Sequence, residues 1–487
     1  MPFSPRRLEA LCTLLPWLLV PAKAALTWEA ATLKAQDFVS HLSTDEKIGI
    51  VSGAYRQPGP ACIGQIGSIP RLNFTGICYA DGPAGFARSD GVSVFPSGLA
   101  AAATWDTELM YERAVAIGEE FRDKGAHVHL GPTTGAIGRH AQGGRNWEGF
   151  GPDPYLAGQA MYASVMGVES QGVQTCSKHF IGNEQETQRT RQVNPDGSTI
   201  EALSSNIDDR TLHELYLWPF ADAVKAGTAS VMCAYSRING KYACSDEGTL
   251  SILKDELAFP GYVVSDWFAT HGTASFANGG LDLEMPGNVS AQYGSSYFGT
   301  PLLQAVENGS VPMTRLDDMA TRVMKPYFRL GQDVDFPPVD PANAATIGVN
   351  TAGHTGIDST PEAIDVRGNH SSLIRKLGAA GTVLLKNTGK FLPLTKPINV
   401  GVFGNGAPYP VSGSVYFNDN SDSQGLEVGL LDIGGGSGSV RHSTLTSPFE
   451  SVRDYVEAYG GRVQALLDND MIAKGTFRSI YPVPDQL

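Results

Sequence analysis

Short apolar runs alternate with amphipathic segments along the first two thirds of the chain. Residues 125–130, 172–178, 229–235 and 261–264 are apolar runs bounded by glycine or polar residues, and this pattern predicts buried strands. Amphipathic stretches with helical spacing lie between them. Strands and helices that alternate in this order predict an α/β fold with parallel strands, most simply a (β/α)8-type TIM-like barrel.

Helix boundaries in this region are marked by capping residues. Asp208 or Asp209 can cap the helix predicted by DRTLHELYLWPFADAVKAG, and Gly227 ends it. A second helix pattern covers residues 105–124 and stops at Gly125. Both patterns fit the crossover helices that a parallel barrel needs between its strands.

The remaining chain has a different pattern. Residues 336–369 are rich in Pro, Ala, Asp and Gly and predict a linker between a barrel domain at 25–335 and a second domain at 370–487. The pattern of residues 370–487 predicts that this second domain is an incomplete α/β sandwich, which follows the barrel. Its expected elements are a helix at 371–381, strands at 382–387 and 398–403, a Gly/Ser-rich loop at 434–439, a helix at 447–461 and a strand at 462–468.

The N-terminus has the pattern of a signal peptide. Arg6 and Arg7 precede an apolar run at 11–20, and Ala22-Lys23-Ala24 resembles a cleavage site. A buried N-terminal helix is the alternative reading. With residues 1–24 assigned as a signal peptide, we expect a secreted, extracellular glycoprotein without a membrane partner.

Export predicts disulfides and glycans. Five cysteines follow residue 24; Cys62 with Cys78 and Cys233 with Cys244 are the close pairs, which leaves Cys176 as a free thiol. No C-x-x-C motif occurs, which argues against a zinc cluster. Four N-x-S/T sequons are candidate glycosylation sites: Asn73, Asn288, Asn308 and Asn369.

Composition and net charge limit the kinds of partner that this chain is expected to bind. The chain has 487 residues, 42% hydrophobic and 18% charged, so a large core can form and disorder is excluded as the main state. Lys and Arg number 36 against 50 Asp and Glu, a net charge of −14. Such an acidic chain lacks the basic surface that nucleic acids and anionic membranes require, so neither is expected as a partner.

Polar and aromatic residues follow several predicted strands, where a parallel barrel places its active site. Asp266 and Trp267 end one strand, Lys178 and His179 end another, and Asp81 ends the run GICYAD. Arg145 lies in the loop GGRNWEGFGPDP with Trp147 and Glu148. Carboxylates, cations and indoles that meet at one barrel mouth suit a sugar, although a phosphorylated substrate is an alternative and each residue alone is more often structural.

Seven ordered motifs resemble glycoside hydrolase family 3, and specifically its fungal-type secreted β-glucosidases. The resemblance runs from about residue 42 to the chain end, and its motifs are YADGPAGFAR (79–88), FPSGLAAAATWD (95–106), GRNWEGFGPDPYLAG (144–158), CSKHFIGNEQE (176–186), VMCAYSRING (231–240), VVSDWFATHG (263–272) and LDLEMPG (281–287). It implies retaining hydrolysis of terminal non-reducing β-D-glucosyl residues from cellobiose, oligosaccharides or aryl glucosides, without metal or cofactor.

The same resemblance assigns roles to residues of this chain. Asp266 matches the nucleophile, and we expect hydrogen bonds and nearby cations to hold its pKa low. Arg88 is a weaker match because Ala87 is inserted before it. The residues that match a glucose pocket are Asp81, Arg88, Arg145, Lys178, His179, Arg189, Tyr235, Trp267 and Ser437.

No acid/base residue is assigned. In the family this glutamate comes from the second α/β domain, beyond the helix–strand unit that corresponds to 447–468. The chain ends at Leu487 before a matching motif or a terminal fibronectin-like domain, and Glu427 and Glu450 lack an acid/base context. We therefore expect a C-terminally truncated β-glucosidase; a natural short variant that is weakly active or an inactive glucose-binding pseudoenzyme, and a β-xylosidase of the same family, are the alternatives.

Overall fold

The computed structural model describes residues 25–53, 62–87, 89–134, 137–139, 141–287, 296–343, 362–409, 429–440 and 442–485. A signal peptide at 1–24 lies outside these residues, as do Arg88, Asn288 and Glu427. No helix of the described part is long and apolar enough to cross a membrane.

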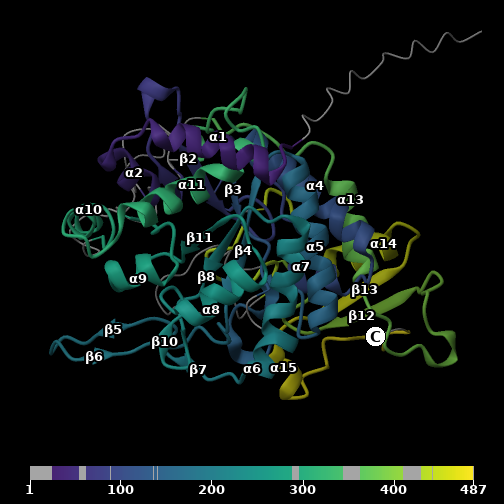
Figure 1. Ribbon diagram of the computed structural model, residues 1–487. Coiled ribbons are helices and arrows are strands. Elements are labelled where there is room, and N and C mark those ends of the chain that lie inside the picture. The colour runs from purple at the N-terminus through teal and green to yellow at the C-terminus, as the bar shows by residue number, and fades with distance from the viewer. Residues whose placement is uncertain are drawn as a thin grey trace, which may run out of the picture.

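A curved six-stranded sheet forms the centre of the N-terminal region (Figure 1). Its strand order is β1-β2-β3-β4-β8-β11, with β1 antiparallel to β2 and every other pair parallel. The single bridges Val264–Leu283 and Glu284–Ser52 extend the curve past β11. The bounds are β1 Gly64–Ile66, β2 Ile77–Asp81, β3 Val128–Leu130, β4 Gln174–Phe180, β8 Ser230–Cys233 and β11 Tyr262–Ser265.

The four predicted strands are present as β3, β4, β8 and β11, and these strands are buried along their full length. Burial on both faces explains their continuous apolar runs, because helices cover the outside of a parallel sheet. The fold is therefore the TIM-like α/β class that the alternating pattern predicts.

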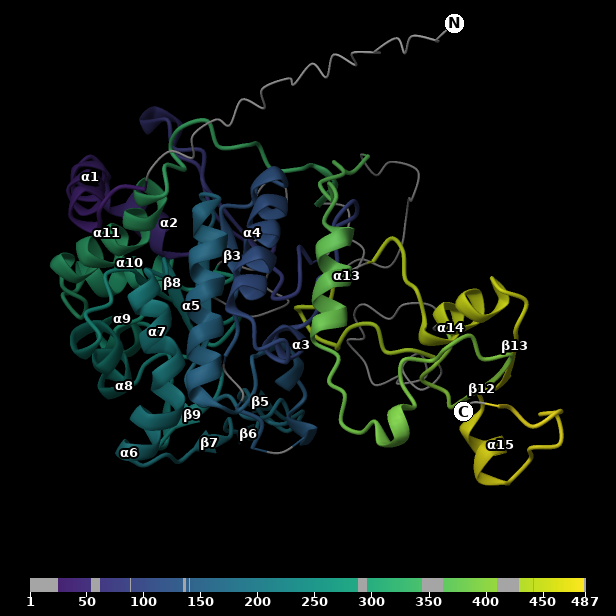
Figure 2. The same cartoon turned by 90° about the vertical axis from the view of Figure 1, so that its right-hand side faces the viewer.

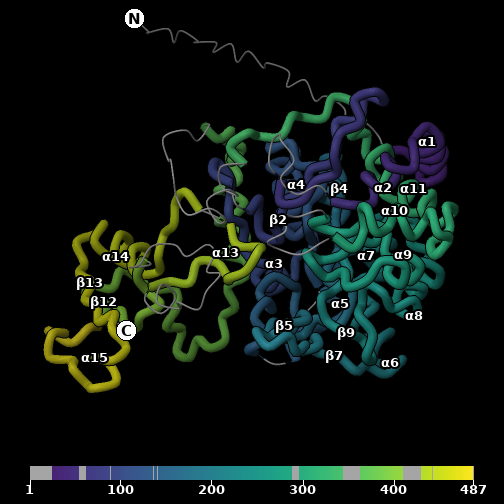
Figure 3. The backbone as a smooth tube through the Cα atoms, turned by 90° about the vertical axis from the view of Figure 1, so that its left-hand side faces the viewer, coloured from purple at the N-terminus to yellow at the C-terminus, as the bar shows by residue number. Residues whose placement is uncertain are grey.

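Helices surround this sheet on its outer side (Figures 1 and 3). The N-terminal pair α1 and α2 contacts α11, while α4, α5 and α7 pack side by side. Their bounds are α1 Trp28–Ser40, α2 Thr44–Val51, α3 Gly98–Ala102, α4 Thr107–Asp123, α5 Pro154–Ser170, α6 Asp209–Thr211, α7 Trp218–Ala226, α8 Glu247–Ser251, α9 Ala274–Gly279, α10 Thr300–Glu307 and α11 Met313–Arg329.

Several shorter strands and helical turns lie at the rim of the barrel. The hairpin β5–β6 is exposed, and β10, β9 and β7 form a small separate sheet. These elements are β5 Gln192–Val193, β6 Thr199–Ile200, β7 Ser204–Ser205, β9 Arg237–Ile238 and β10 Lys241–Tyr242, with irregular helical turns η1 Pro70–Leu72, η2 Ala141–Gly143, η3 Asn146–Glu148, η4 Leu212–Leu217 and η5 Ile252–Glu256.

Local capping explains where the helices begin and end. The Asp208 side chain accepts a hydrogen bond from the Thr211 amide, and Gly227 ends the same helical stretch with φ +96°. The Asp106 carboxylate accepts from the Glu108 and Leu109 amides at the start of α4. These contacts satisfy amides that have no partner inside a helix, and a left-handed C-cap favours glycine.

The described parts of the segment predicted as a linker pack on the barrel. The Lys124 ammonium lies 2.7 Å from the Asp340 carboxylate, and both side chains are fully buried. Lys124 also donates to the carbonyls of Asp90 and Ile364. One buried ammonium therefore ties residues on both sides of 344–361 to the end of α4.

The C-terminal region forms a smaller lobe beside the barrel (Figures 2 and 3). Its α13 contacts α3 and α4 of the barrel, and β12 pairs in parallel with β13. Ser447 and Glu450 form a capping box at the start of α14. The bounds are α13 Ser371–Ala380, η8 Thr388–Lys390, β12 Asn399–Phe403, α14 Pro448–Glu457, β13 Arg462–Leu466 and α15 Asn469–Ala473.

One predicted strand of this lobe is wrong. Residues 382–387 have no regular structure, and Val383, Leu384 and Leu385 are 61%, 61% and 91% exposed. Strand propensity is realised only when a neighbouring strand supplies hydrogen bonds and a packing surface. The other predicted elements of the lobe, the helices at 371–381 and 447–461 and the strands at 398–403 and 462–468, are present.

Candidate active site

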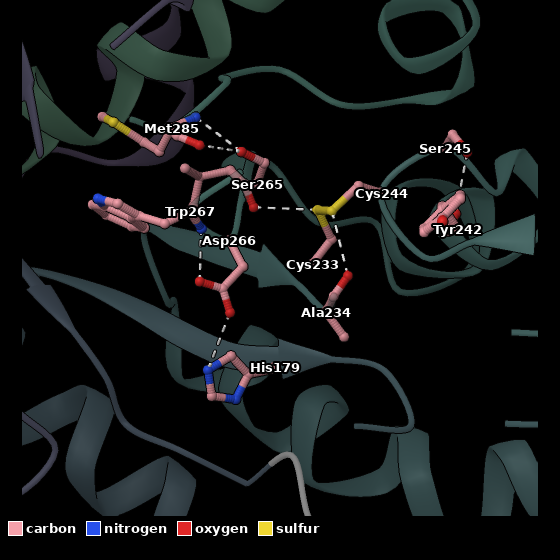
Figure 4. The surroundings of a disulfide bond; sticks show 11 residues. His179, Cys233, Ala234, Tyr242, Cys244, Ser245, Ser265, Asp266, Trp267 and Met285 are labelled. Carbon is pink, nitrogen blue, oxygen red and sulfur yellow. Dashed lines mark hydrogen bonds and ion pairs between the residues drawn. A yellow bond between two sulfur atoms is a disulfide. The ribbon is translucent and has the colours of Figure 1, made fainter. Parts of the chain in front are cut away.

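Asp266 lies directly after β11, at the carboxyl end of the parallel sheet. Its Oδ1 accepts a 2.7 Å hydrogen bond from the Trp267 amide, and its Oδ2 lies 3.6 Å from Nε2 of His179. Figure 4 shows the carboxylate pointing toward the imidazole of His179, which extends from β4. Only 6% of Asp266 is exposed, so the barrel shields this carboxylate from most of the solvent.

Lys178 and Asp81 bring a second pair of charges to the same end of the sheet. Lys178 belongs to β4 and Asp81 is the last residue of β2, and their Nζ and Oδ1 atoms lie 3.8 Å apart. Both side chains are buried. The sequence predicts that three strand ends converge, and the structure places Asp81, Lys178, His179 and Asp266 at them.

Arg145 links the barrel to the Gly/Ser-rich loop of the second lobe. Its guanidinium makes two 2.9 Å hydrogen bonds to the Glu148 carboxylate, and one of its nitrogens lies 3.5 Å from Oγ of Ser437. Gly434 in the same loop lies against Trp147, where a Cβ would approach the indole nitrogen to 2.2 Å. Ser437 therefore reaches the cluster although it is 292 residues away from Arg145 in sequence.

Arg189 and Tyr235 form another side of the cluster. The Arg189 guanidinium lies 4.1 Å from the centre of the Tyr235 ring and 2.6 Å from the Glu186 carboxylate. Burial and the neighbouring Asp266 carboxylate raise the pKa of Tyr235 well above its usual value. The phenol therefore stays protonated and can donate a hydrogen bond beside Asp266.

The Trp267 indole packs toward β1. Its Nε1 donates a 3.2 Å hydrogen bond to the Ile63 carbonyl, and Gly64 leaves room for the ring because a Cβ there would approach Trp267 to 2.7 Å. The indole is half-buried. A fixed indole with one accessible part is suited to contact with the apolar face of a sugar.

Burial determines the protonation of the central residues. The pKa of His179 falls well below its usual value because of burial and the nearby Arg145, Lys178 and Arg189 cations, so the imidazole is neutral. Burial raises the pKa of Asp266 above its usual value, although Arg189, Arg145 and Lys178 act in the opposite direction. The expectation of a low pKa for Asp266 is therefore wrong, because desolvation of the carboxylate outweighs its cations and its hydrogen bond.

A disulfide fixes the strand next to Asp266. Cys233, the last residue of β8, is bonded to Cys244 (Figure 4), and the Cys233 carbonyl accepts a hydrogen bond from the Asp266 amide at 3.3 Å. Cys62 is bonded to Cys78, so both disulfides join the pairs that the sequence predicts. Cys176 is a buried free thiol inside the barrel.

The remaining predicted residues have simpler surroundings. Asn73, Asn308 and Asn369 are exposed, as a glycan would require. The Glu450 carboxylate accepts from the Ser447 amide in the α14 capping box, which gives this glutamate a structural role. Among the described residues, no group of three or more His, Cys, Asp or Glu side chains is arranged to hold a metal ion.

The sequence analysis assigns no role to two glutamates that belong to this site. Glu148 neutralises the buried Arg145, and Glu186 orients Arg189. Each stands three residues from its arginine, and this i, i+3 spacing of opposite charges is the signal that could reveal both.

A parallel β/α barrel with buried carboxylates, cations and indoles at the carboxyl ends of its strands is the arrangement of a barrel enzyme that acts on a polar, sugar-like substrate. The family model for the glycosyl hydrolase family 3 N-terminal domain matches residues 77–325. This match covers half of the chain and every barrel residue of the site. The chain belongs to glycoside hydrolase family 3.

Curated relatives extend the similarity beyond the barrel. The chain is 48% identical over 477 residues to probable beta-glucosidase G of Aspergillus flavus, which covers 95% of the chain and 57% of the relative. It is 41% identical to a probable beta-glucosidase of Arthroderma benhamiae, over 97% of the chain and 59% of the relative. The chain thus spans less than two thirds of the length of these curated relatives.

Solved structures show the same fold. A beta-glucosidase of Chaetomella raphigera superposes with a TM-score of 0.81 at 38% identity, over 93% of this chain and 59% of that one. The beta-glucosidase DesR of Streptomyces venezuelae, solved with D-glucose, gives a TM-score of 0.69 at 28% identity, over 89% and 50% of the two chains.

Proposed function

We propose that this chain carries the glucose-binding and nucleophilic part of a retaining β-glucosidase. The observation that carries the proposal is the position of Asp266, a buried carboxylate at a strand end with Lys178, His179, Arg145, Arg189 and Tyr235 around it. The relatives named as beta-glucosidases support the same activity. The substrate is a β-glucoside such as an aryl glucoside or a short cello-oligosaccharide.

In the first step, an Asp266 oxygen attacks the anomeric carbon of the bound glucosyl unit. The bond from that carbon to the aglycone oxygen breaks, its electron pair leaves with the aglycone, and a glucosyl ester forms on Asp266. In the second step, water attacks the same carbon, the ester bond breaks and its electron pair returns to the carboxylate, while the proton that the water loses passes to the solvent. The net change is hydrolysis with retention of the β configuration.

The surrounding side chains hold the sugar in position for this attack. Asp81 can accept hydrogen bonds from sugar hydroxyls, whereas Lys178, His179 and Arg145 can donate them. Ser437 adds a hydroxyl from the second lobe, next to Arg145. Trp267 flanks the sugar ring. Such positioning contributes to rate because the reacting atoms no longer have to find each other.

The pKa of Asp266 determines where activity declines on the acid side of the pH–activity profile. Only the ionised carboxylate is a nucleophile, and burial raises its pKa above the usual carboxyl value. As the pH is lowered, we therefore expect activity to decline at a higher pH than it would if the nucleophile were an exposed aspartate.

The departing aglycone oxygen needs a proton unless it is stable as an anion. In the described part of the chain, Glu450 caps α14, and Glu148 and Glu186 are each paired with an arginine, so we assign none of these three as the acid that donates it. General acid catalysis contributes roughly 10²–10⁴ to the rate. Glucosides with good leaving groups, such as 2,4-dinitrophenolate, do not need it and therefore test the Asp266 step alone.

We also propose that the chain is exported and glycosylated. The basic and apolar pattern of residues 1–24 and the exposed sequons at Asn73, Asn308 and Asn369 support this. The presence of two disulfides fits an oxidising compartment.

Hydrolysis of 2,4-dinitrophenyl β-D-glucoside by wild type and by Asp266→Ala tests the nucleophile. We expect the variant to lose roughly 10⁴-fold or more in kcat, because the covalent route disappears. Thermal melting of both proteins shows that the variant is folded. Equal rates in the two proteins would contradict the assignment of Asp266 as the nucleophile. If wild type cleaves 2,4-dinitrophenyl β-D-xyloside faster than the glucoside, xylose rather than glucose is the preferred sugar.

A further inference from the structure

The backbone turn that follows Asp81 is closely packed. Asp81 is the last residue of β2, and within the turn the Gly85 amide donates to the Gly82 carbonyl at 3.2 Å. A Cβ at position 82 would approach the Gly85 carbonyl oxygen to 1.8 Å, so only glycine fits there. The Ala87 amide donates back to the Asp81 carbonyl at 2.9 Å. The path of this turn therefore determines where the end of β2 holds Asp81.

Two side chains from other elements hold the carbonyl groups of this turn. Nε2 of His129, in β3, lies 2.8 Å from the Gly82 carbonyl oxygen. The guanidinium of Arg113, in α4, donates to the Pro83 carbonyl at 2.7 Å and to the Pro96 carbonyl at 2.8 Å. Two successive carbonyls of the turn are thus each fixed by a different neighbouring element.

The protonation of His129 makes it the donor in its contact. Burial lowers the pKa of His129 to about 3, so the ring is neutral and carries one N–H group. A carbonyl oxygen can only accept, so this N–H is at Nε2 and points to Gly82. Nδ1 is then an acceptor, and it has no hydrogen-bond partner within the described residues. A buried nitrogen without a partner lowers stability, which favours a functional reason for the imidazole.

Arg113 is also a group that is unfavourable to bury. It is 3% exposed, and in the described part of the chain both of its side-chain hydrogen bonds go to uncharged carbonyls. Burial lowers its pKa to about 10, so the guanidinium remains charged at neutral pH. An apolar residue at this position of α4 would fill the core without burying a charge. The contacts with the two loops, rather than packing, therefore explain the cation.

We propose that Arg113 and His129 are positioning residues for the reaction, which fix the turn after β2 so that Asp81 meets the sugar. This inference rests on the proposed glucosidase function, in which Asp81 accepts hydrogen bonds from the glucosyl unit. Neither residue has to touch the sugar, because both act through the carbonyls of residues 82 and 83. The Asp81 carboxylate lies 3.8 Å from Nζ of Lys178, so a displaced turn would move it relative to this cation and to the sugar. Such displacements reduce the rate strongly.

A double-mutant cycle with 2,4-dinitrophenyl β-D-glucoside tests whether His129 acts through Asp81. Asp81→Ala should lower kcat/KM roughly 10- to 150-fold, because hydrogen bonds between the sugar and a charged group are lost. His129→Leu should lower kcat/KM roughly 3- to 30-fold in the wild-type background. In the Asp81→Ala background the same substitution should change kcat/KM by less than about twofold, because the carboxylate that it would displace is absent.

Further variants separate positioning from folding. His129→Gln can still donate an N–H to the turn and should keep kcat/KM within about threefold of wild type. The matched control is His127→Leu, because His127 is also a buried neutral imidazole but lies before β3, where its Nδ1 accepts from the Cys78 amide. It should lower the melting temperature and leave kcat/KM within about twofold of wild type. Arg113→Met keeps the apolar stem and should repeat the cycle of His129→Leu, also where the latter does not fold.

The outcomes distinguish this inference from the function beneath it. Equal losses from His129→Leu with and without Asp81, or an equal loss from His127→Leu, would reveal a general effect on the barrel and overturn the positioning role. Unchanged kcat/KM in His129→Leu and Arg113→Met would also overturn it and leave the glucosidase function intact. If the wild-type protein does not cleave the glucoside, the glucosidase function fails and the positioning role fails with it.

Discussion

The barrel and the C-terminal lobe obtain their order in different ways. In the barrel, β2, β3, β4, β8 and β11 are buried along their length and belong to one sheet. In the lobe, the described strands form only the pair β12–β13, and the apolar residues Val383, Leu384 and Leu385 are exposed. The barrel therefore builds its own core, whereas the lobe leaves apolar surface that a packed α/β domain would cover.

The site reflects this difference. Nearly all of its charged groups come from barrel elements, and the lobe adds the loop that carries Ser437 and lies against Trp147. The charged cluster around Asp266 can thus form on a barrel whose neighbouring lobe is only partly packed. The comparison leads to four predictions, of which the first has the largest expected effect.

Removing the buried partner of Arg145 should damage the protein most. Glu148→Gln leaves a buried guanidinium without its carboxylate, and we expect the free energy of unfolding to fall by about 3–5 kcal/mol. Glu186→Gln is the matched control, because the Glu186–Arg189 pair is about 30% exposed and should cost less than about 1 kcal/mol. Urea unfolding measures both, and equal losses would contradict the difference in burial.

Leucine truncations compare the two regions directly. Leu316 in α11 is fully buried, so Leu316→Ala should lower the free energy of unfolding by about 2–5 kcal/mol. Leu385 in the lobe is 91% exposed, so Leu385→Ala should change it by less than about 0.5 kcal/mol. A large stability loss for Leu385→Ala would show that 382–387 is packed in solution.

The disulfide beside Asp266 should stabilise the barrel by a moderate amount. Cys233 and Cys244 are 11 residues apart, and closing a loop of this size in the unfolded chain is worth about 3 kcal/mol. The double variant Cys233→Ala/Cys244→Ala should therefore melt at a lower temperature than wild type under oxidising conditions. Once a reductant has opened the bond in the wild type, the two proteins should have the same melting temperature. A difference in melting temperature that persists in reductant would show that the cysteine side chains stabilise the barrel by packing instead.

The Asp266 carboxylate should lower the free energy of unfolding at neutral pH. Because the folded protein raises the pKa of Asp266, the folded state favours the protonated carboxyl, and ionisation at higher pH weakens folding. Asp266→Asn should thus melt above wild type at pH 7. The gain should vanish below the ordinary carboxyl pKa of 3.8, where the aspartate is protonated in both states. A variant that melts lower than wild type at pH 7 would contradict the sign of this effect.

Local sequence patterns predict the elements of both regions well. The helix that starts at Asp208 and ends at Gly227 and the strand before Asp266 depend on capping and on continuous apolar runs, which a short stretch of sequence displays. The pairing of Cys233 with Cys244 likewise follows from residues close in the chain. These features need no knowledge of distant contacts.

Features that depend on distant contacts are harder to predict. The apolar run at 382–387 looks like a strand, yet pairing is decided by neighbours that the run itself does not encode. The pKa of Asp266 depends on how far burial outweighs three cations from other elements, which no motif states. The resemblance to a known family, rather than the residue pattern, connects Ser437 with a pocket formed by the barrel.

Covalent labelling of Asp266 is the most direct test of the central claim. A 2-deoxy-2-fluoro-β-D-glucoside with a good leaving group should inactivate the protein slowly, because the fluorine makes hydrolysis of the glucosyl ester slow. Mass analysis of the digested protein should then place the added fluoroglucosyl group on the peptide that contains Asp266. A label on another residue, or hydrolysis of the activated glucoside with no covalent adduct at any time, would contradict the account.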